Sequence, residues 1–262
     1  KWRLENRNTN LKKLIQLSLQ NSFELKDVYR IIIWPETSFE GTIPNEMELL
    51  SVISKRVLTD QKAILVVGLL RVDKNKLFNS LVFLNSKGNI IHQYDKIHLV
   101  PFGEYIPLRN KFTTIANFLS LKDFSSGNIK PNFTLKGLGN ILTLICYEIL
   151  FTEEVISRLS KNTNLLINIT NDAWFGKTIG PYQHLALAKI KAVELGIPLA
   201  RVANTGISAL ISPYGEEITK IPLYESGVRT AKLSLPLKNT IYRKYGEIIF
   251  IVSILFLIFI NN

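Results

Sequence analysis

The chain has 262 residues, and 47% of them are hydrophobic. Its formal net charge is +11 at pH 7, and it contains a single cysteine. This length is enough for one large domain with a sizeable core, and a single cysteine excludes an internal disulfide. No basic run with interleaved aromatic residues is present, so nucleic acid is not expected as a partner.

The first half of the chain alternates helical and strand patterns. The spacing of Leu and Ile in residues 11–22 predicts a helix, and "YRIIIWPE" predicts a buried strand that stops at Pro35. A second helix is predicted over residues 46–60, followed by the strand "AILVVGLL". The stretch "LVFLNSKGNIIHQYDKIHL" has the pattern of a hairpin that turns at "NSKGN". Residues 101–129 lack core periodicity and are predicted to be irregular.

The second half continues the alternation. "FTLKGLGNILTLICYEI" predicts a hairpin that turns at "GLGN", and a helix is predicted over residues 151–162 with two glutamates in its first turn. Strand "LLINITND", helix "PYQHLALAKIKAVEL" and hairpin "ARVANTGISALISPYGEEI" follow. Strands alternating with helices, together with several hairpins, predict an α/β fold with mixed sheets.

The C-terminal run "IIFIVSILFLIFI", residues 248–260, is apolar on every face. A helix of this length spans about 20 Å, against roughly 30 Å for a hydrocarbon core, so a buried core helix is one interpretation. We prefer a short membrane helix, because the preceding "YRKY" holds residue types that anchor helix ends at membrane surfaces. The positive charge of the chain suits either a solvated surface or attraction to anionic lipid headgroups. The prediction is a body over 1–237, a linker over 238–246 and a membrane helix over 247–262.

Three predicted strands end in a reactive side chain: Glu36 in "IIIWPETSFEG", Lys96 in "HQYDKIHLVPFGEYIP" and Cys146 in "LICYEILF". Each has an ordinary explanation alone, as a turn glutamate, a solvated lysine or a core cysteine. Together they can meet at one rim of a sheet. The thiol would then be the nucleophile and Glu36 its general base. Lys96 would favour the thiolate and donate to the oxyanion of a tetrahedral intermediate.

The sequence resembles the nitrilase superfamily, whose members use a Glu–Lys–Cys triad in this chain order. Within it, the chain is similar to the catalytic domain of the apolipoprotein N-acyltransferases. The resemblance spans nearly the whole chain and implies a nitrilase-like α-β-β-α sandwich with Glu36, Lys96 and Cys146 as catalytic residues. The matching words are "WPE" (34–36), "YDKIHLVPFGEYIP" (94–107), "CYE" (146–148), "NDAWFG" (171–176) and "GPYQHLALAKIKAVELGIPLARVANTGIS" (180–208).

The resemblance also implies supporting residues around the triad. Glu104 matches a second glutamate of the family, with an implied role of holding Lys96 or the substrate in place. Tyr147 and Glu148 match residues that flank the nucleophile and shape the pocket. The backbone N–H of Tyr147 is a candidate second donor to the oxyanion.

Three aromatic residues are possible substrate contacts. Trp174 and Phe175 are either core aromatics or, by the resemblance, lid or lipid contacts, and Trp2 matches a tryptophan near the start of the family's domain. Asn171 and Asp172 end a predicted strand, where turn chemistry is their default explanation. No metal or nucleotide cofactor is expected, because no GxSxG or nucleotide loop is present and the histidines lack metal-ligand spacing and are interpreted as structural: His92, His98 and His184.

The implied reaction is a ping-pong acyl transfer. Cys146 attacks an ester of a phospholipid and becomes a thioester, and the amine of diacylglyceryl-cysteine at a lipoprotein N-terminus takes the acyl group. The implied location is the bacterial inner membrane with the catalytic domain facing the periplasm, although Arg243 and Lys244 before the tail point to the cytoplasm by the positive-inside rule.

Complete members of the family carry N-terminal membrane helices and a first strand that precede the part matched here. We therefore expect a catalytic domain without its first strand, and a separate N-terminal membrane part is a possible partner. Two alternatives stay open from the sequence. One is a soluble nitrilase-type amidase, in which water resolves the thioester, and the other is an inactive fragment that only associates with membrane.

Overall fold

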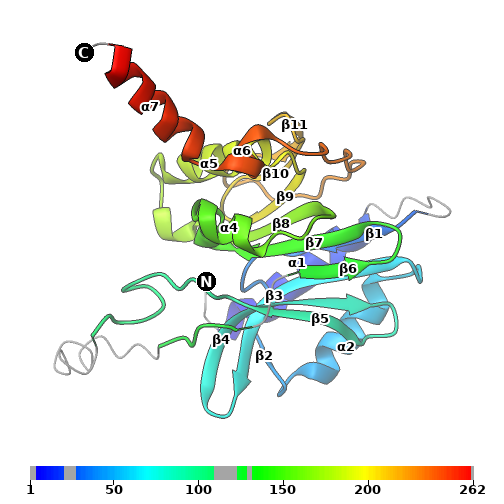
Figure 1. Cartoon of the computed structure of the whole chain (residues 1–262). Coiled ribbons are helices and arrows are strands. Elements are labelled where there is room, and N and C mark those ends of the chain that lie inside the picture. Colours follow the sequence, from blue (N-terminus) through cyan, green and yellow to red (C-terminus); the bar gives the residue numbers. More distant parts are fainter. Residues whose placement is uncertain (1–3, 21–27, 109–122, 129–131, 261–262) are drawn as a thin grey trace.

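Two β-sheets pack face to face in the computed structural model, and helices cover both outer faces (Figure 1). The structure describes residues 4–20, 28–108, 123–128 and 132–260. The four layers follow the order helix, sheet, sheet, helix. The predicted α/β sandwich with mixed sheets is therefore confirmed.

The N-terminal half builds the first sheet and its helices. Strands β1 and β2 pair with β3 in parallel, and β4 and β5 continue in antiparallel pairing, so that the order is β1-β3-β4-β5 with β2 also on β3. Its elements are α1 (Leu4–Gln20), β1 (Arg30–Ile33), β2 (Thr42–Ile43), α2 (Met47–Val57), β3 (Ala63–Asp73), β4 (Lys76–Asn85) and β5 (Ile90–Asp95).

The second sheet has the order β11-β10-β9-β8-β7-β6, and its central strands β7, β8 and β9 are parallel. The carboxyl ends of these three strands therefore lie at one edge of the sheet. Its elements are β6 (Asn132–Leu135), β7 (Gly139–Ile145), the 3₁₀ helix η1 (Cys146–Leu150), α4 (Thr152–Arg158), β8 (Thr163–Asn171), the 3₁₀ helix η2 (Asp172–Phe175), α5 (Gly180–Leu195), β9 (Leu199–Asn204), β10 (Ser208–Ile211) and β11 (Glu217–Ile221).

Period-2 alternation along the strands produces three hydrophobic cores. In β3, Leu65 and Val67 pack against α1 and α2, while Ile64 and Val66 face the other sheet. Side chains also alternate along strand β7. Leu144 faces α4 and α5, and Ile145 faces the intersheet core. Both sheets are buried on both faces, which explains their nearly continuous apolar runs.

Some elements differ from the sequence prediction, and the helix predicted over 151–162 ends at Arg158. The first helix begins at Leu4 rather than near residue 11. Strands β3 and β4 form one long hairpin, which turns through Lys74 and Asn75 at φ of 45° and 67°. Turns with two positive φ angles usually contain Asn-Gly or Asp-Gly. Here the two turn residues are Lys and Asn, so the sequence did not predict this hairpin.

The predicted apolar helix at the C-terminus is present as α7 (Ile248–Ile260), and a short helix α6 (Ile241–Tyr245) lies within the predicted linker. Helix α7 projects away from the sandwich (Figure 1), and its described side chains are exposed. Within the described ranges, no helix is long and apolar enough to cross a membrane. Thirteen residues reach only about 20 Å of the roughly 30 Å that crossing requires.

Truncating a core leucine tests this layering. Leu144 is fully buried beneath α4 and α5, whereas Leu255 on α7 is 59% exposed. Leu144→Ala should lower the free energy of unfolding by about 2–5 kcal/mol, because it removes buried methyl groups and leaves a cavity. Leu255→Ala should change it by much less. Urea titration of the chain in detergent measures both, and equal losses would contradict the assigned layers.

Candidate active site

The three reactive residues of the sequence motifs lie together at the carboxyl ends of strands from both sheets. Glu36 follows β1, Lys96 follows β5 and Cys146 follows β7. Glu36 and Lys96 are only 6% and 1% exposed. The charges of Glu36 and Lys96 both act on the Cys146 thiol, and those of Glu36 and Cys146 act on Lys96. The predicted convergence at one rim therefore occurs.

Glu104 lies against Lys96. The Nζ atom of Lys96 is 2.8 Å from Oε2 of Glu104, and the same oxygen accepts a hydrogen bond from the N–H of Val100 at 2.8 Å. Glu104 is thus fixed by its own loop and is not an exposed loop glutamate. Burial alone would lower the pKa of Lys96, but Glu36, Cys146 and Glu104 hold it above its ordinary value, so this amine is charged.

Asn79 on β4 joins the two glutamates, and the sequence interpretation missed it. Its Nδ2 donates to Oε1 of Glu36 at 2.7 Å and to Oε1 of Glu104 at 2.9 Å. The backbone carbonyl oxygen of Asn79 accepts from the N–H of Lys96 at 2.8 Å. The only local signal is a polar Asn-Ser pair inside the apolar run "LFNSLVFL".

The pKa values of Glu36 and of the Cys146 thiol are both raised. Burial raises the pKa of Glu36 above the ordinary carboxyl range, although Lys96 and Asn79 oppose it. Its Oε2 is buried and has no hydrogen-bond partner of normal geometry among the described residues. Burial and the charge of Glu36 raise the pKa of Cys146 to about 12, against the lowering effects of Lys96 and of a hydrogen bond with Thr170.

The resting cysteine is therefore a thiol at neutral pH. Lys96 favours the thiolate, as predicted, but its charge does not outweigh burial and Glu36. Attack by sulfur must then be accompanied by transfer of the thiol proton. Glu36 can accept that proton on its unpartnered oxygen.

Cys146 has a left-handed backbone, with φ of +54°. This conformation costs a non-glycine residue about 1–3 kcal/mol and persists only where the surroundings enforce it. The residue sits at the sharp change from β7 to η1. The N–H of the preceding residue, Ile145, donates to Oε2 of Glu148 at 2.7 Å, which fixes one side of this turn.

Glu148 also ties the nucleophile turn to the segment after Lys96. Its buried Oε1 accepts hydrogen bonds from the Tyr94 hydroxyl at 2.6 Å and from the N–H groups of Ile97 and His98 at 2.9 and 3.1 Å. Arg158 lies 3.3 Å from the same oxygen and balances its charge. Glu148 therefore links the two sheets at the site and does more than line a pocket.

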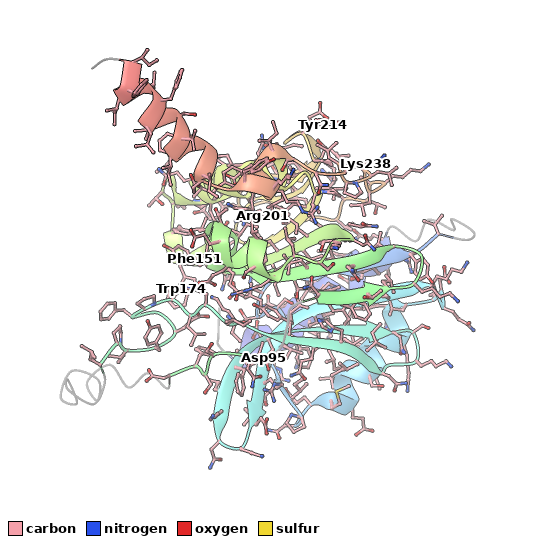
Figure 2. The ribbon with its side chains drawn as sticks, in the orientation of Figure 1. Asp95, Phe151, Trp174, Arg201, Tyr214 and Lys238 are labelled. Atoms are coloured by element: carbon pink, nitrogen blue, oxygen red, sulfur yellow. The ribbon has the colours of Figure 1, made fainter. Side chains whose placement is uncertain are left out.

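The aromatic side chains next to the strand ends of the second sheet differ in exposure. Trp174 on η2 is 78% exposed at the edge of the molecule (Figure 2), so it is not a core aromatic. Phe175 packs edge-on against His184, and Tyr147 packs edge-on against Phe151. Trp2 lies outside the described residues.

Two residues read as turn residues have different roles. Asn171 does make a turn contact, since its Oδ1 accepts the N–H of Ala173. Asp172 instead forms a fully buried ion pair with Arg201 at 2.8 Å. This correction has a simple cause, because the cation comes from β9, about thirty residues along the chain. Within the part of the chain that the structure describes, no cluster of three or more His, Cys, Asp or Glu side chains is placed to hold a metal ion.

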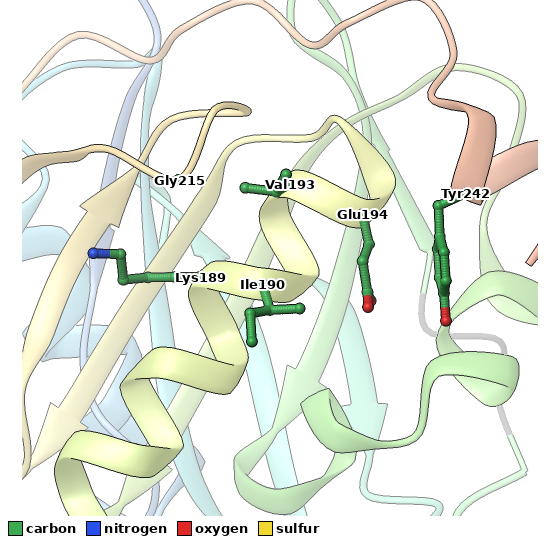
Figure 3. A pocket seen from close by; sticks show the side chains of 6 residues that line it. All are labelled: Lys189, Ile190, Val193, Glu194, Gly215 and Tyr242. Atoms are coloured by element: carbon green, nitrogen blue, oxygen red, sulfur yellow. The ribbon is translucent and has the colours of Figure 1, made fainter. Parts of the chain in front are cut away.

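A separate cavity of about 480 Å³ lies on the exposed face of α5 (Figure 3). Ile190 and Val193 line it and are half exposed, whereas His184 on the opposite face of the helix is buried. The triad residues do not line this cavity. It is therefore distinct from the candidate active site.

Gly68 on β3 allows the backbone of Glu36 to approach the sheet. A β-carbon at this position would lie 2.4 Å from the carbonyl oxygen of Pro35 and 2.7 Å from Cα of Glu36. Gly68→Ala should displace Glu36 and slow acylation of Cys146 by p-nitrophenyl acetate about 10- to 100-fold. The burst of p-nitrophenolate measures this rate. Gly227→Ala, where the nearest atom is 3.9 Å away, should leave it unchanged.

Replacing the proposed base separates its two effects on the thiol. Glu36→Gln removes a carboxylate that raises the pKa of Cys146. Each unit by which that pKa falls gives about tenfold more thiolate at pH 8, so alkylation by iodoacetamide should accelerate. Acylation by p-nitrophenyl acetate should fall about 10²- to 10⁴-fold, because the general base is lost.

The single cysteine makes alkylation a measure of this one thiol. Glu153→Gln on the exposed side of α4 is the matched control and should change neither rate. Slower or unchanged alkylation of Glu36→Gln would contradict the electrostatic coupling between Glu36 and Cys146.

Comparison with known proteins agrees with the fold. Residues 3–241 match the carbon-nitrogen hydrolase family. Among solved structures, the carbon-nitrogen hydrolase from Helicobacter pylori G27 is similar in fold, with a TM-score of 0.63, 15% identity and coverage of 85% of this chain and 82% of that chain. Nit3 of Saccharomyces cerevisiae is similar with a TM-score of 0.63 and 18% identity, over 84% and 82% of the two chains.

Curated relatives are more similar in sequence. An apolipoprotein N-acyltransferase of Rhizobium etli is 42% identical over 75% of this chain and 38% of its own length. One from Rickettsia prowazekii is 34% identical over 95% of this chain and 50% of its own length. The chain thus spans half or less of the length of these two relatives. It belongs to the carbon-nitrogen hydrolase family, within the nitrilase superfamily, and resembles the apolipoprotein N-acyltransferases of that superfamily.

Proposed function

We propose that this chain transfers a fatty acyl group from a phospholipid, through a thioester on Cys146, to the amine of diacylglyceryl-cysteine at a lipoprotein N-terminus. The observation that carries the proposal is the cluster of the buried Glu36 and Lys96 with the partly buried thiol of Cys146. It occurs in a chain whose relatives are named apolipoprotein N-acyltransferases.

In the first half-reaction, Sγ of Cys146 attacks the ester carbonyl carbon while Glu36 accepts the thiol proton. The ammonium of Lys96 and the N–H of Tyr147 stabilise the oxyanion of the tetrahedral intermediate. The ester C–O bond then breaks, and Glu36 returns its proton to the departing glycerol oxygen. The products are a lysophospholipid and an acyl thioester.

In the second half-reaction, the amine of diacylglyceryl-cysteine attacks the thioester carbonyl carbon. Glu36 accepts a proton from the attacking nitrogen and delivers it to sulfur as the C–S bond breaks. The products are an amide and the restored thiol. Glu104 and Asn79 keep Lys96 and Glu36 in place through both steps.

Both substrates are lipids, so the proposal includes a membrane surface. The exposed apolar α7, the accessible Trp174 and the net charge of +11 are features that suit contact with an anionic lipid surface. We propose the bacterial inner membrane with the site facing the periplasm. The chain spans half or less of the length of these two curated relatives. We also propose a separate membrane part, on a second polypeptide, as a partner.

Intact mass spectrometry after incubation with phospholipid tests the first half-reaction. The detergent-solubilised chain should gain the mass of one fatty acyl group, and hydroxylamine should remove it because a thioester is labile. Cys146→Ser should remain unmodified under the same conditions. Adding a synthetic diacylglyceryl-cysteine peptide should then discharge the adduct to an N-acylated peptide.

Other outcomes point elsewhere. Release of acid from small amides without any lipid, and without transfer to the peptide, would contradict the proposal and indicate an amidase. If no adduct forms, the assay is repeated with the part of a curated relative that this chain does not match. Continued absence would indicate a chain that only associates with membrane.

A further inference from the structure

Polar side chains lie buried behind Cys146, and the proposed reaction uses none of them. We call them the Arg201 cluster, and its members are Asn168, Thr170, Asp172, His184 and Arg201, all buried. The guanidinium of Arg201 is among the largest fully buried groups of the chain. Burying a charge costs free energy unless the charge is paired and hydrogen-bonded. The buried position of Arg201 therefore needs a physical explanation.

A chain of hydrogen bonds connects Arg201 to the nucleophile. Nη1 of Arg201 donates to Oδ1 of Asn168 at 2.7 Å. The amide Nδ2 of Asn168 donates to the carbonyl oxygen of Cys146 at 3.2 Å. Since Asn168 presents its oxygen to Arg201, its nitrogen must face Cys146. Arg201 therefore decides which way the Asn168 amide points.

Asp172 holds the guanidinium in that orientation. Its Oδ2 accepts from Nη2 of Arg201 at 2.8 Å, while Oδ1 accepts from the Thr170 hydroxyl at 3.1 Å and lies 3.0 Å from Nδ1 of His184. Burial would raise the pKa of Asp172, but the hydrogen bond with His184 and the charge of Arg201 hold it below its usual range. Burial lowers the pKa of His184, which is therefore neutral and donates from Nδ1.

The cluster is closely packed against the neighbouring backbone. A β-carbon on Gly206 would lie 2.2 Å from Oδ2 of Asp172, so the backbone after β9 closes over the ion pair. Strands β7 and β8 are parallel neighbours, with Leu144 opposite Asn168 in register. The cluster thus supports the carbonyl side of the Cys146 turn, while Glu148 supports its amide side.

We propose that Arg201 is a positioning residue: through Asn168 it holds the carbonyl group of Cys146 and so fixes the left-handed turn that presents the thiol. The geometry of the guanidinium is essential to this role, because two nitrogens must reach Asn168 and Asp172 at once. A lysine amine keeps the charge but offers no such planar fork. The inference rests on the proposed function only in taking Cys146 as the nucleophile.

Two variants test the role in the full, detergent-solubilised chain. Asn168→Asp has the same shape and keeps an acceptor for Arg201, but it cannot donate to the carbonyl oxygen of Cys146. Arg201→Lys keeps the charge and loses the fork. Both should lower the maximal rate of Cys146 acylation by p-nitrophenyl acetate about 10- to 100-fold, with the half-saturating ester concentration unchanged.

Leu195→Ala controls for lost stability, since Leu195 at the end of α5 is fully buried in the core between the helices and the second sheet and its side chain makes no hydrogen bond. Rates are compared at equal thermal stability. If both variants acylate at the rate of this control, the cluster is only structural and the proposal is wrong. A wild-type rate in Arg201→Lys would equally overturn it, since charge alone would then suffice.

Phospholipid is run beside the ester to separate this inference from the proposed function. Wild-type chain that reacts with the ester but not with phospholipid would contradict the proposed function, while the ester rates still decide the role of Arg201. Reaction with neither donor would overturn both, because Cys146 would then not be a nucleophile.

Discussion

The buried charge of Lys96 is the constraint on which the rest of the site depends. Removing an ammonium from water costs several kcal/mol, about as much as a buried ion pair returns when its geometry is good. Lys96 therefore requires Glu104 at 2.8 Å and Glu36 close by. Those carboxylates would repel each other, and the amide of Asn79 lies between them as a donor to both. The end of β1, the middle of β4 and the loop after β5 are fixed together by this one charge.

The proposed nucleophile belongs to the other sheet, so the site depends on how the two sheets pack. Cys146 and Glu148 follow β7, and Glu148 binds the backbone of Ile97 and His98, directly after Lys96. The intersheet core of Ile, Val and Phe side chains sets the distance that these hydrogen bonds must bridge. Polar contacts at the rim fix the final alignment, because apolar packing alone is not directional.

The sequence predicted what depends on local pattern and on contiguous motifs. Apolar runs and hairpin patterns predicted most strands of both sheets, and the motifs around Glu36, Lys96 and Cys146 predicted that these three residues converge. Asn79, Gly68 and Arg201 were missed, because each matters through a residue far away in the chain. Gly68 is needed for the backbone of Glu36, and Arg201 pairs with Asp172, which locally resembles a turn residue. The hairpin at Lys74 and Asn75 was missed for a local reason. Both residues have positive φ, but the pair Lys-Asn is not a usual sequence for such a turn.

The distribution of charge explains why base and nucleophile must act together. Glu36 and Glu104 place two carboxylates beside the single ammonium of Lys96. Ionising Cys146 alone would add a third negative charge to this buried space, and its pKa of about 12 expresses that cost. If the thiol proton passes to Glu36, one negative charge disappears as another forms, and the net charge of the cluster stays constant. The same argument applies to the proposed attack of an amine on the thioester, because Glu36 can again accept the proton that the amine loses. A buried glutamate with a raised pKa is therefore suited to both half-reactions.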